Sequence, residues 1–151
     1  MIVESTKAII AKLLNIFIVS IGAIFLILIG PSIDEVFPVV YPFNVEYVQQ
    51  LDNKVEIYGT ALKIRDCKPI DVQVLAYDDN RTGTLGSIEY KDTPTGIIPA
   101  RPKSDNTQNW GPWVLTVPIN TTTIEISALH KCHILWDTRT YFTTLELKDY
   151  K

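Results

Sequence analysis

The chain has little of what most enzymes and nucleic-acid-binding proteins need. Its 151 residues include only two histidines, and the sequence contains no G-x-S-x-G, H-E-x-x-H or phosphate-binding glycine loop. A nucleophile and its base would therefore have to include one of these two histidines. The formal net charge of -3 is slight and negative, whereas a nucleic-acid partner would need a clustered basic face. We predict a protein that is not an enzyme and has no nucleic-acid partner.

A long run without charge is the clearest feature that is present. Residues 13–29, LLNIFIVSIGAIFLILI, contain no charged residue and would form a helix of roughly 25 Å. Together with the apolar residues before Lys12, the run exceeds the roughly 30 Å of a bilayer core. Gly30 and Pro31 should end this helix. The sequence predicts an uncleaved transmembrane anchor, represented by Leu13, Phe17, Gly22, Phe25 and Ile29.

The charges on either side of this run predict its orientation. Lys7 and Lys12 precede it, whereas Asp34 and Glu35 follow it. The positive-inside rule then places the N-terminus in the cytoplasm and the rest of the chain in a periplasm, lumen or extracellular space. A cleavable signal peptide is the competing interpretation, but its apolar run usually has only about 7 to 15 residues. Residues 1–30 are thus expected to form a cytoplasmic stub and a single span in an inner or cell membrane.

The rest of the chain has the pattern of a β domain. Residues 31–44 contain three prolines, which predict a stiff spacer or, alternatively, an edge strand. From residue 45 onward, short Val-, Ile-, Thr- and Tyr-rich segments alternate with turn residues. In KVEIYGTALKI the apolar face should change from Val55 and Ile57 to Leu62 and Ile64, through a β-bulge at Gly59. Six or seven strands in residues 45–151 predict an immunoglobulin-like antiparallel β-sandwich.

The segment ALHKCHILW, residues 128–136, gathers both histidines and one of the two cysteines. In an ideal strand His130 and Cys132 share the apolar face, and His133 points the other way. We expect Cys132 to be buried and to pair with Cys67, because an oxidising compartment favours a disulfide. His130 is then a partly buried neighbour of the bridge, and His133 a residue at the rim.

A metal site is the competing interpretation of the same residues. Cys67, His130, Cys132 and His133 together supply four ligands of the kinds that copper and zinc accept. The usual paired C-x-x-C spacing is missing, and His133 would need a bulge to reach the other three. We therefore expect no cofactor and keep copper as the alternative.

The two cysteines also bear on the immunoglobulin comparison. Their separation of 65 residues fits the immunoglobulin pattern. However, no tryptophan follows Cys67 at the expected distance, and His130 stands where that fold has a corner tyrosine. The prediction is therefore limited to a sandwich of that general architecture.

Residues 92–111 form a polar, proline-containing segment that is too long for a tight hairpin. It is expected either to bind a partner or simply to cross between sheets. The sequence NWGPW places Trp110 and Trp113 at its end. Trp113 opens an apolar strand and should fill the core, whereas Trp110 is the better surface candidate. There it would contact a protein or a sugar, with Arg101 as a further contact in the same segment.

The segments GTALKIRDC, VLAYDD, WGPW and HKCHILWDT, in this order, resemble uncharacterised phage-type proteins with one N-terminal membrane span and a short β-rich ectodomain. The resemblance covers roughly residues 55–138. It is carried by Arg65 to Cys67, Trp110 to Trp113 and Cys132 to Thr138. It implies a bacterial or phage inner-membrane setting and no particular activity.

The leading functional hypothesis is an accessory subunit or interaction module of a membrane assembly. Its partners would be membrane lipid around the helix and other membrane or periplasmic proteins. Ser20 and Gly22 would allow close approach of a partner helix. The alternatives are a membrane-tethered copper or redox protein that uses the cysteine–histidine cluster, and a carbohydrate-binding module that uses Trp110.

Overall fold

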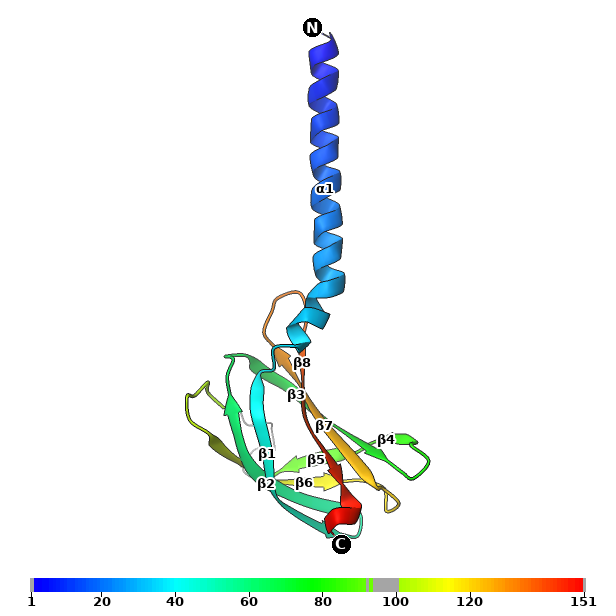
Figure 1. The fold of residues 1–151 in the computed structure, drawn as a ribbon, viewed down its shortest axis with the longest axis vertical. Coiled ribbons are helices and arrows are strands. Elements are labelled where there is room, and N and C mark those ends of the chain that lie inside the picture. The colour runs from blue at the N-terminus through cyan, green and yellow to red at the C-terminus, as the bar shows by residue number, and fades with distance from the viewer. Residues whose placement is uncertain (1, 92, 94–100, 151) are drawn as a thin grey trace. The chain divides into compact units, whose positions relative to one another are not determined.

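The fold consists of one apolar helix followed by a domain of β-strands. The computed structural model describes residues 2–91, 93 and 101–150. Contacts divide the chain into two compact units, Met1–Val36 and Phe37–Lys151. Figure 1 shows the elements, which are α1 (Ile2–Glu35), β1 (Val40–Leu51), β2 (Lys54–Lys63), β3 (Lys68–Tyr77), β4 (Gly83–Leu85), β5 (Ser87–Tyr90), β6 (Gln108–Thr116), β7 (Thr123–Lys131), β8 (Thr138–Glu146) and the 3-10 helix η1 (Leu147–Tyr150).

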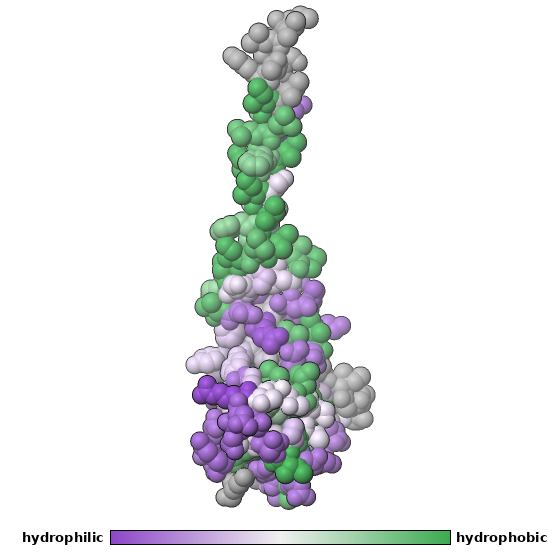
Figure 2. Space-filling view, turned by 90° about the vertical axis from the view of Figure 1, so that its right-hand side faces the viewer, coloured by the Kyte–Doolittle hydropathy of each residue, from purple (hydrophilic) through white to green (hydrophobic). Residues whose placement is uncertain are grey.

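The first unit is a helix whose described side chains are largely exposed. Its segment Ile10–Glu35 is long and apolar enough to cross a membrane, and no residue of its apolar 18-residue window is buried in the protein. Leu13, Phe17 and Phe25 are all exposed, and Figure 2 shows apolar side chains covering much of the visible helix surface. A helix that is apolar on all sides needs an apolar environment, which a bilayer provides.

The predicted end of the helix at Pro31 was wrong. Pro31 lies inside α1, which continues to Glu35. A proline lacks one N–H group and removes only its own backbone hydrogen bond, so the residues after it can complete one more turn. The residues predicted to be a spacer are therefore divided between the end of α1 and the start of β1, which is an edge strand.

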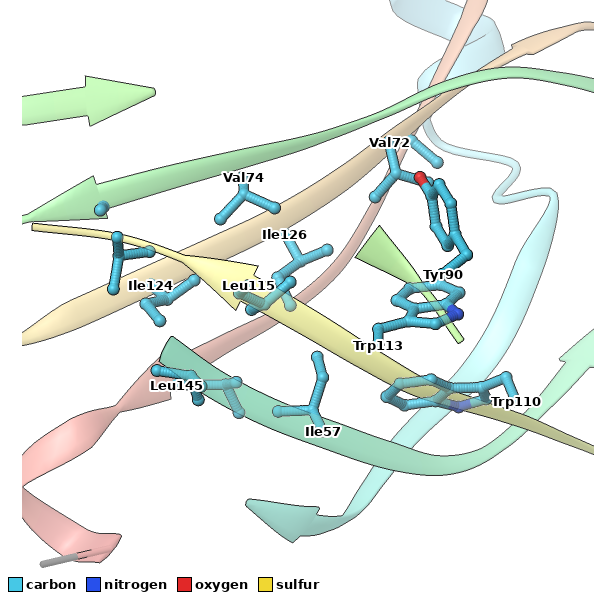
Figure 3. Packing of buried hydrophobic residues seen from close by; sticks show 14 of the residues in the cluster. Ile57, Val72, Val74, Tyr90, Trp110, Trp113, Leu115, Ile124, Ile126 and Leu145 are labelled. Carbon is cyan, nitrogen blue, oxygen red and sulfur yellow. The ribbon is translucent and has the colours of Figure 1, made fainter. Parts of the chain in front are cut away.

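The second unit is built from two antiparallel sheets. One has the strand order β1-β2-β6-β5 and the other β4-β3-β7-β8. Apolar side chains from both sheets form one buried cluster, and Figure 3 shows several of them pointing toward one another. Ile57 and Leu115 come from the first sheet, and Val74, Ile124 and Ile126 from the second. Alternation of apolar and polar residues along each strand puts one face of each sheet into this core.

The predicted irregularity at Gly59 exists, but it lies in the neighbouring strands. Ile57 and Gly59 are two residues apart in β2, but their partners in β6, Trp113 and Trp110, are three residues apart. Strand β6 therefore contains one extra residue at this point. Along β1 an extra residue also stands opposite Gly59. The alternation of β2 itself is unbroken, so Ala61 and not Leu62 faces the core. Gly59 is needed because an added Cβ would overlap the backbone oxygen of Asn44.

The segment DDNRTG, residues 78–83, is one of the turns between strands. Asp78 follows β3, and its Oδ1 accepts hydrogen bonds from the backbone N–H groups of Asn80 and Thr82. This is the local side-chain-to-backbone bonding that makes aspartate common in turns. The turn directs the chain from β3 into β4, whose residues pair with the end of β3.

Candidate binding cavity

A cavity of about 70 Å³ lies inside the β domain. Its wall is formed by β1, β2 and β6 of one sheet and by β3, β7 and β8 of the other. The lining residues come from the ends of β2 and β7 and from the starts of β1, β3 and β6. This volume holds a few water molecules or one small chemical group.

Aromatic side chains form most of one side of the cavity. Phe43 stacks on Trp110 and on Phe142, with 4.4 Å between ring centroids in both pairs. Trp110 also contacts Trp113 at a centroid distance of 4.7 Å. Offset stacking of this kind favours fixed ring positions. The aromatic side is therefore a preformed apolar surface that does not need a ligand to assemble it.

Trp110 was predicted at the surface, and that prediction was wrong. Its side chain is only 2% exposed, and Trp113 is buried as well. Residues three apart on a regular strand point to opposite faces. The β6 bulge opposite Ile57 and Gly59 removes this restriction and turns both indoles inward. The strand also begins earlier than expected, at Gln108, so Trp110 lies within it and not in a loop.

Of the five buried polar side-chain atoms that have no hydrogen-bond partner within the described part of the chain, three belong to residues of the cavity wall. They are Nε1 of Trp110, Nε1 of Trp113 and Nδ1 of His130. All three residues line the cavity. Buried polar groups in folded proteins are nearly always hydrogen-bonded, so each exception calls for an explanation. Here the cavity contains two N–H donors and one imidazole nitrogen that a guest molecule can satisfy.

His130 is neutral in this environment. Its residue is only 4% exposed. Burial, and to a lesser extent the charges of Lys63 and Arg65, together lower the pKa of His130 to about 4. A neutral imidazole has one donor and one acceptor nitrogen, so Nδ1 can take either role.

The rim of the cavity is basic. Lys63 is the next residue after Ala61 on the inward face of β2. Its Nζ donates a hydrogen bond of 2.7 Å to the backbone oxygen of Arg101. The same ammonium lies 4.0 Å from Asp66 Oδ1. Burial lowers the pKa of Lys63, and the charge of Asp66 partly opposes this. A shallow depression beside it is lined by Lys63, Lys68 and Arg101 together with Asp66. Three basic residues and one acidic residue thus line this depression.

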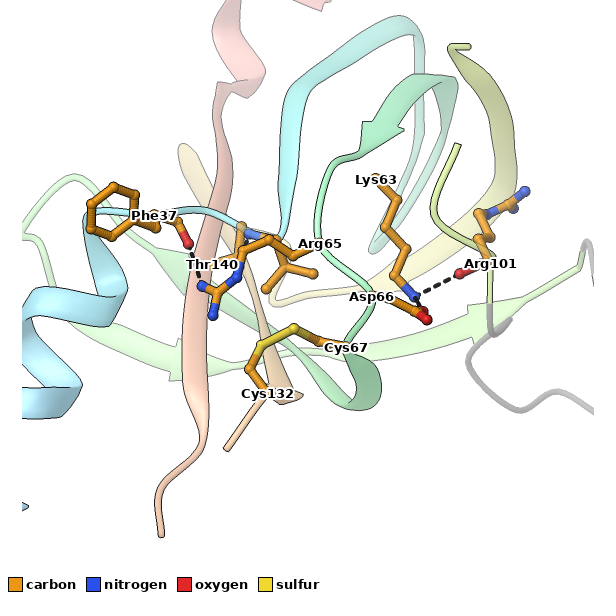
Figure 4. Close-up of a disulfide and its surroundings, with 9 residues drawn as sticks. Phe37, Lys63, Arg65, Asp66, Cys67, Arg101, Cys132 and Thr140 are labelled. Carbon is orange, nitrogen blue, oxygen red and sulfur yellow. Dashed lines mark hydrogen bonds and ion pairs between the residues drawn. A yellow bond between two sulfur atoms is a disulfide. The ribbon is translucent and has the colours of Figure 1, made fainter. Parts of the chain in front are cut away.

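The structure places the two cysteine sulfurs at disulfide distance, 2.11 Å (Figure 4). Cys67 directly precedes β3 and Cys132 directly follows β7. Lys68 and Lys131, the last register pair of these two strands, lie next to the bridge. The bridge therefore joins neighbouring strands of one sheet. The immunoglobulin pattern differs, because its bridge connects the two sheets.

The predicted alternation through ALHKCHILW holds only as far as His130. Strand β7 ends at Lys131, and the following residues form a loop. Cys132 is half-buried and not fully buried as expected, while Ile134 is exposed because it lies beyond the strand. His133 is exposed, and its ring lies 4.7 Å from that of Trp136.

The predicted metal ligands do not gather around a common point. Among the residues that the structure describes, no three His, Cys, Asp or Glu side chains are grouped to hold a metal. Both cysteine sulfurs are bonded to each other, so neither is available as a thiolate ligand. His130 faces the cavity, whereas His133 lies in the exposed loop. The residues therefore do not fit the copper alternative.

Several cavity residues escaped sequence reasoning. Lys63, Phe43 and Phe142 carry no motif, and they meet only because three strands converge. Lys63 had one usable signal, since it continues the alternating inward face of residues 55, 57, 59 and 61. Arg101, Trp110, Trp113 and His130 were candidates from the sequence, and all four line the cavity. The segment predicted as a binding loop lies partly outside the described residues.

Comparison with protein-family models, with curated proteins and with solved structures finds no match to this chain. The functional argument therefore depends on the geometry of the cavity and on the chemistry of the residues around it.

Proposed function

We propose that this protein is a single-pass, membrane-anchored binding module of a membrane assembly, and that it has no catalytic role. The cavity is the recognition site, and its ligand is an apolar group with an acidic head, such as the terminal carboxylate of a partner protein. One observation carries the proposal: His130 Nδ1 and two indole N–H groups are buried without partners in an aromatic cavity beneath a basic rim.

The chemistry of the cavity favours this ligand class. Phe43, Phe142 and the indole rings offer an apolar surface to the body of the ligand. Lys63 and the indole N–H groups supply donors to a carboxylate, and hydrogen bonds to charged groups are stronger than neutral ones. The sugar-binding alternative loses its support, because Trp110 is buried and cannot present an open stacking face.

Membrane anchoring is supported by the apolar helix, and an extracytoplasmic domain by the paired cysteines. A disulfide persists in oxidising compartments, and Lys7 and Lys12 favour a cytoplasmic N-terminus. We therefore propose a periplasmic or luminal β domain. We retain the immunoglobulin-like label only for its two-sheet architecture, and we retain the phage-type setting as an untested proposal.

Membrane insertion and topology can be tested together. The full chain, carrying a C-terminal alkaline phosphatase, should cofractionate with membranes after carbonate washing and be enzymatically active. A green fluorescent protein fused at the same position should be dark, because it does not fold after Sec-dependent export. A soluble product with two free thiols would contradict the anchoring and the proposed compartment.

Ligand recognition can be tested with benzoate and benzyl alcohol, which share a ring but differ in charge. The indole N–H resonances of Trp110 and Trp113 in the detergent-solubilised full chain should shift with benzoate and much less with benzyl alcohol. Lys63→Met should weaken benzoate binding by about tenfold or more, since a charge-assisted hydrogen bond contributes roughly 1.5–3 kcal/mol. Lys91→Met is the matched control, because Lys91 pairs with Glu56 away from the cavity lining. Equal responses to both probes would contradict the proposal.

A further inference from the structure

The loop between β7 and β8, residues 132–137, exposes a pair of large aliphatic side chains. Ile134 is 95% exposed and Leu135 is 70% exposed. Trp136 follows them and is half-buried. Two adjacent aliphatic residues with this exposure are costly in water, and such surface features mark interaction sites.

This loop has three features that fix its shape. Cys132, its first residue, is bonded to Cys67. Lys131 Nζ and Asp137 Oδ1 form an ion pair of 2.9 Å that closes its base. The rings of His133 and Trp136 lie 4.7 Å apart within it. The aliphatic tip is therefore presented on a closed and bridged loop.

The same end of the β domain receives the chain as it leaves α1. Arg65 Nη1 donates a hydrogen bond of 2.7 Å to the backbone oxygen of Phe37, and Arg65 lies two residues before Cys67. The backbone N–H of Val39 donates to Thr140 Oγ1 of β8 at 3.1 Å. Figure 4 shows Phe37 and Thr140 beside Arg65 and the disulfide. The entry point of the domain is thus close to the base of the 132–137 loop.

Covalent continuity connects this end of the domain to the membrane. Phe37 comes two residues after Glu35, the last residue of α1, and two residues span at most about 7 Å. Val36 and Phe37 are themselves exposed and apolar, so the apolar surface continues past the helix. At this end the β domain therefore begins within two residues of the apolar helix.

We propose that the 132–137 loop inserts Ile134, Leu135 and Trp136 into the headgroup region of the bilayer that α1 spans. The inference rests on the proposed membrane anchoring and is independent of the ligand in the cavity. The Nε1 of Trp136 is buried in the protein, so it is the exposed part of its ring that adds apolar surface to that of Ile134 and Leu135. The span and the loop would then give the protein two points of attachment to the membrane.

The experiment uses the full chain reconstituted in phosphatidylcholine vesicles whose acyl chains are brominated near the headgroup or near the chain end. Bromine close to the headgroup should quench the fluorescence of Trp136, and bromine at the chain end should quench it less. Trp136→Phe should lose this quenching, because Trp110 and Trp113 are buried in the protein. The variant I134S/L135S should also lose it while the near-ultraviolet circular dichroism stays native.

A matched control moves the reporter to the opposite end of β7. Ile119, in the turn before β7, is 79% exposed. Combining Ile119→Trp with Trp136→Phe should give fluorescence that brominated lipid does not quench.

If the wild-type chain floats with the vesicles but Trp136 is not quenched, the loop proposal is overturned. If the chain does not float at all, the proposed membrane anchoring itself fails. A dimer that dissociates in I134S/L135S, with Trp136 unquenched, would also overturn the proposal, because a second copy would then cover the loop.

Discussion

Phe43 and Trp110 stack with their ring centroids 4.4 Å apart, although they come from β1 and β6, which lie on opposite sides of β2. Both neighbours of β2 carry an irregularity opposite Gly59. Bulges twist and bend a strand and redirect the side chains beyond it. We infer that the paired bulges at Gly59 allow these two rings to meet and form the aromatic side of the cavity.

The first prediction concerns the residue at the centre of this arrangement. Gly59→Ala should destabilise the β domain by about 3 kcal/mol, because the new Cβ would meet rigid backbone and not a flexible side chain. Urea unfolding of the detergent-solubilised chain, followed by near-ultraviolet circular dichroism, measures the change. Gly22→Ala is the control, since an added Cβ there has nothing within 4 Å. Equal stability of the two variants would contradict the role given to Gly59.

The second prediction concerns the packing of Trp110. Trp110→Ala should lower the free energy of unfolding by about 3–5 kcal/mol, because it removes a buried indole that stacks on Phe43. Leu85→Ala should change stability by less than about 0.5 kcal/mol, because Leu85 is exposed at the end of β4. Thermal unfolding of the two variants under identical conditions gives the comparison. A small effect at Trp110 would mean that this indole is at the surface after all.

The third prediction concerns the bridge between β3 and β7. Replacing Cys67 and Cys132 by serine should cost about 4 kcal/mol, because the bridge closes a loop of 65 residues and so restricts the unfolded chain. Reduction of the wild-type protein should produce a similar loss, while the double-serine variant should not respond to reductant. Unfolding with and without dithiothreitol separates these outcomes. Wild-type stability that does not depend on reductant would contradict the pairing.

The membrane-type helix and most strands could be predicted because their signals are local. Strand β5 coincides with SIEY, and β7 follows TIEISALHK. Strand β3 follows the alternation of IDVQVLAY from Val72 onward, whereas Ile70, expected on the inward face, is exposed beside a register shift. These patterns arise when one face of a strand is buried and the other is not. The positions of turns such as Asp78–Thr82 follow from side-chain bonding within a few residues.

The cavity could not be predicted, because it depends on the pairing of distant strands. Trp113 was expected in the core and Trp110 at the surface, and only the register with β2 shows that a bulge in β6 turns both inward. In the same way, the bulge that was predicted in β2 at Gly59 is found in the two neighbouring strands, β1 and β6. A register shift of one residue reverses the face of every later residue in the strand. The sequence of a single strand does not reveal where such a shift occurs.

The last prediction concerns the buried imidazole. The pKa of His130 is lowered to about 4 in the folded protein from 6.5, first by burial and then by the charges of Lys63 and Arg65. The unfolded chain therefore takes up a proton as the pH falls below about 6.5, while the folded protein does not until about pH 4. Stability should decrease across this interval, by on the order of 3 kcal/mol in total for this one group.

The measurement must separate His130 from the carboxylates that titrate in the same pH range. Urea unfolding of the wild type and of His130→Gln, repeated from pH 7.5 down to pH 4.5, gives two curves whose difference isolates the imidazole. The wild type should lose stability more steeply, because glutamine binds no proton in either state. His133→Gln is the matched control, since it makes the same substitution at the second histidine, which is exposed in the loop after β7 and does not line the cavity. If His130→Gln retained the wild-type slope, the imidazole could not be buried and neutral, and the cavity would lose one of its three unpartnered polar atoms.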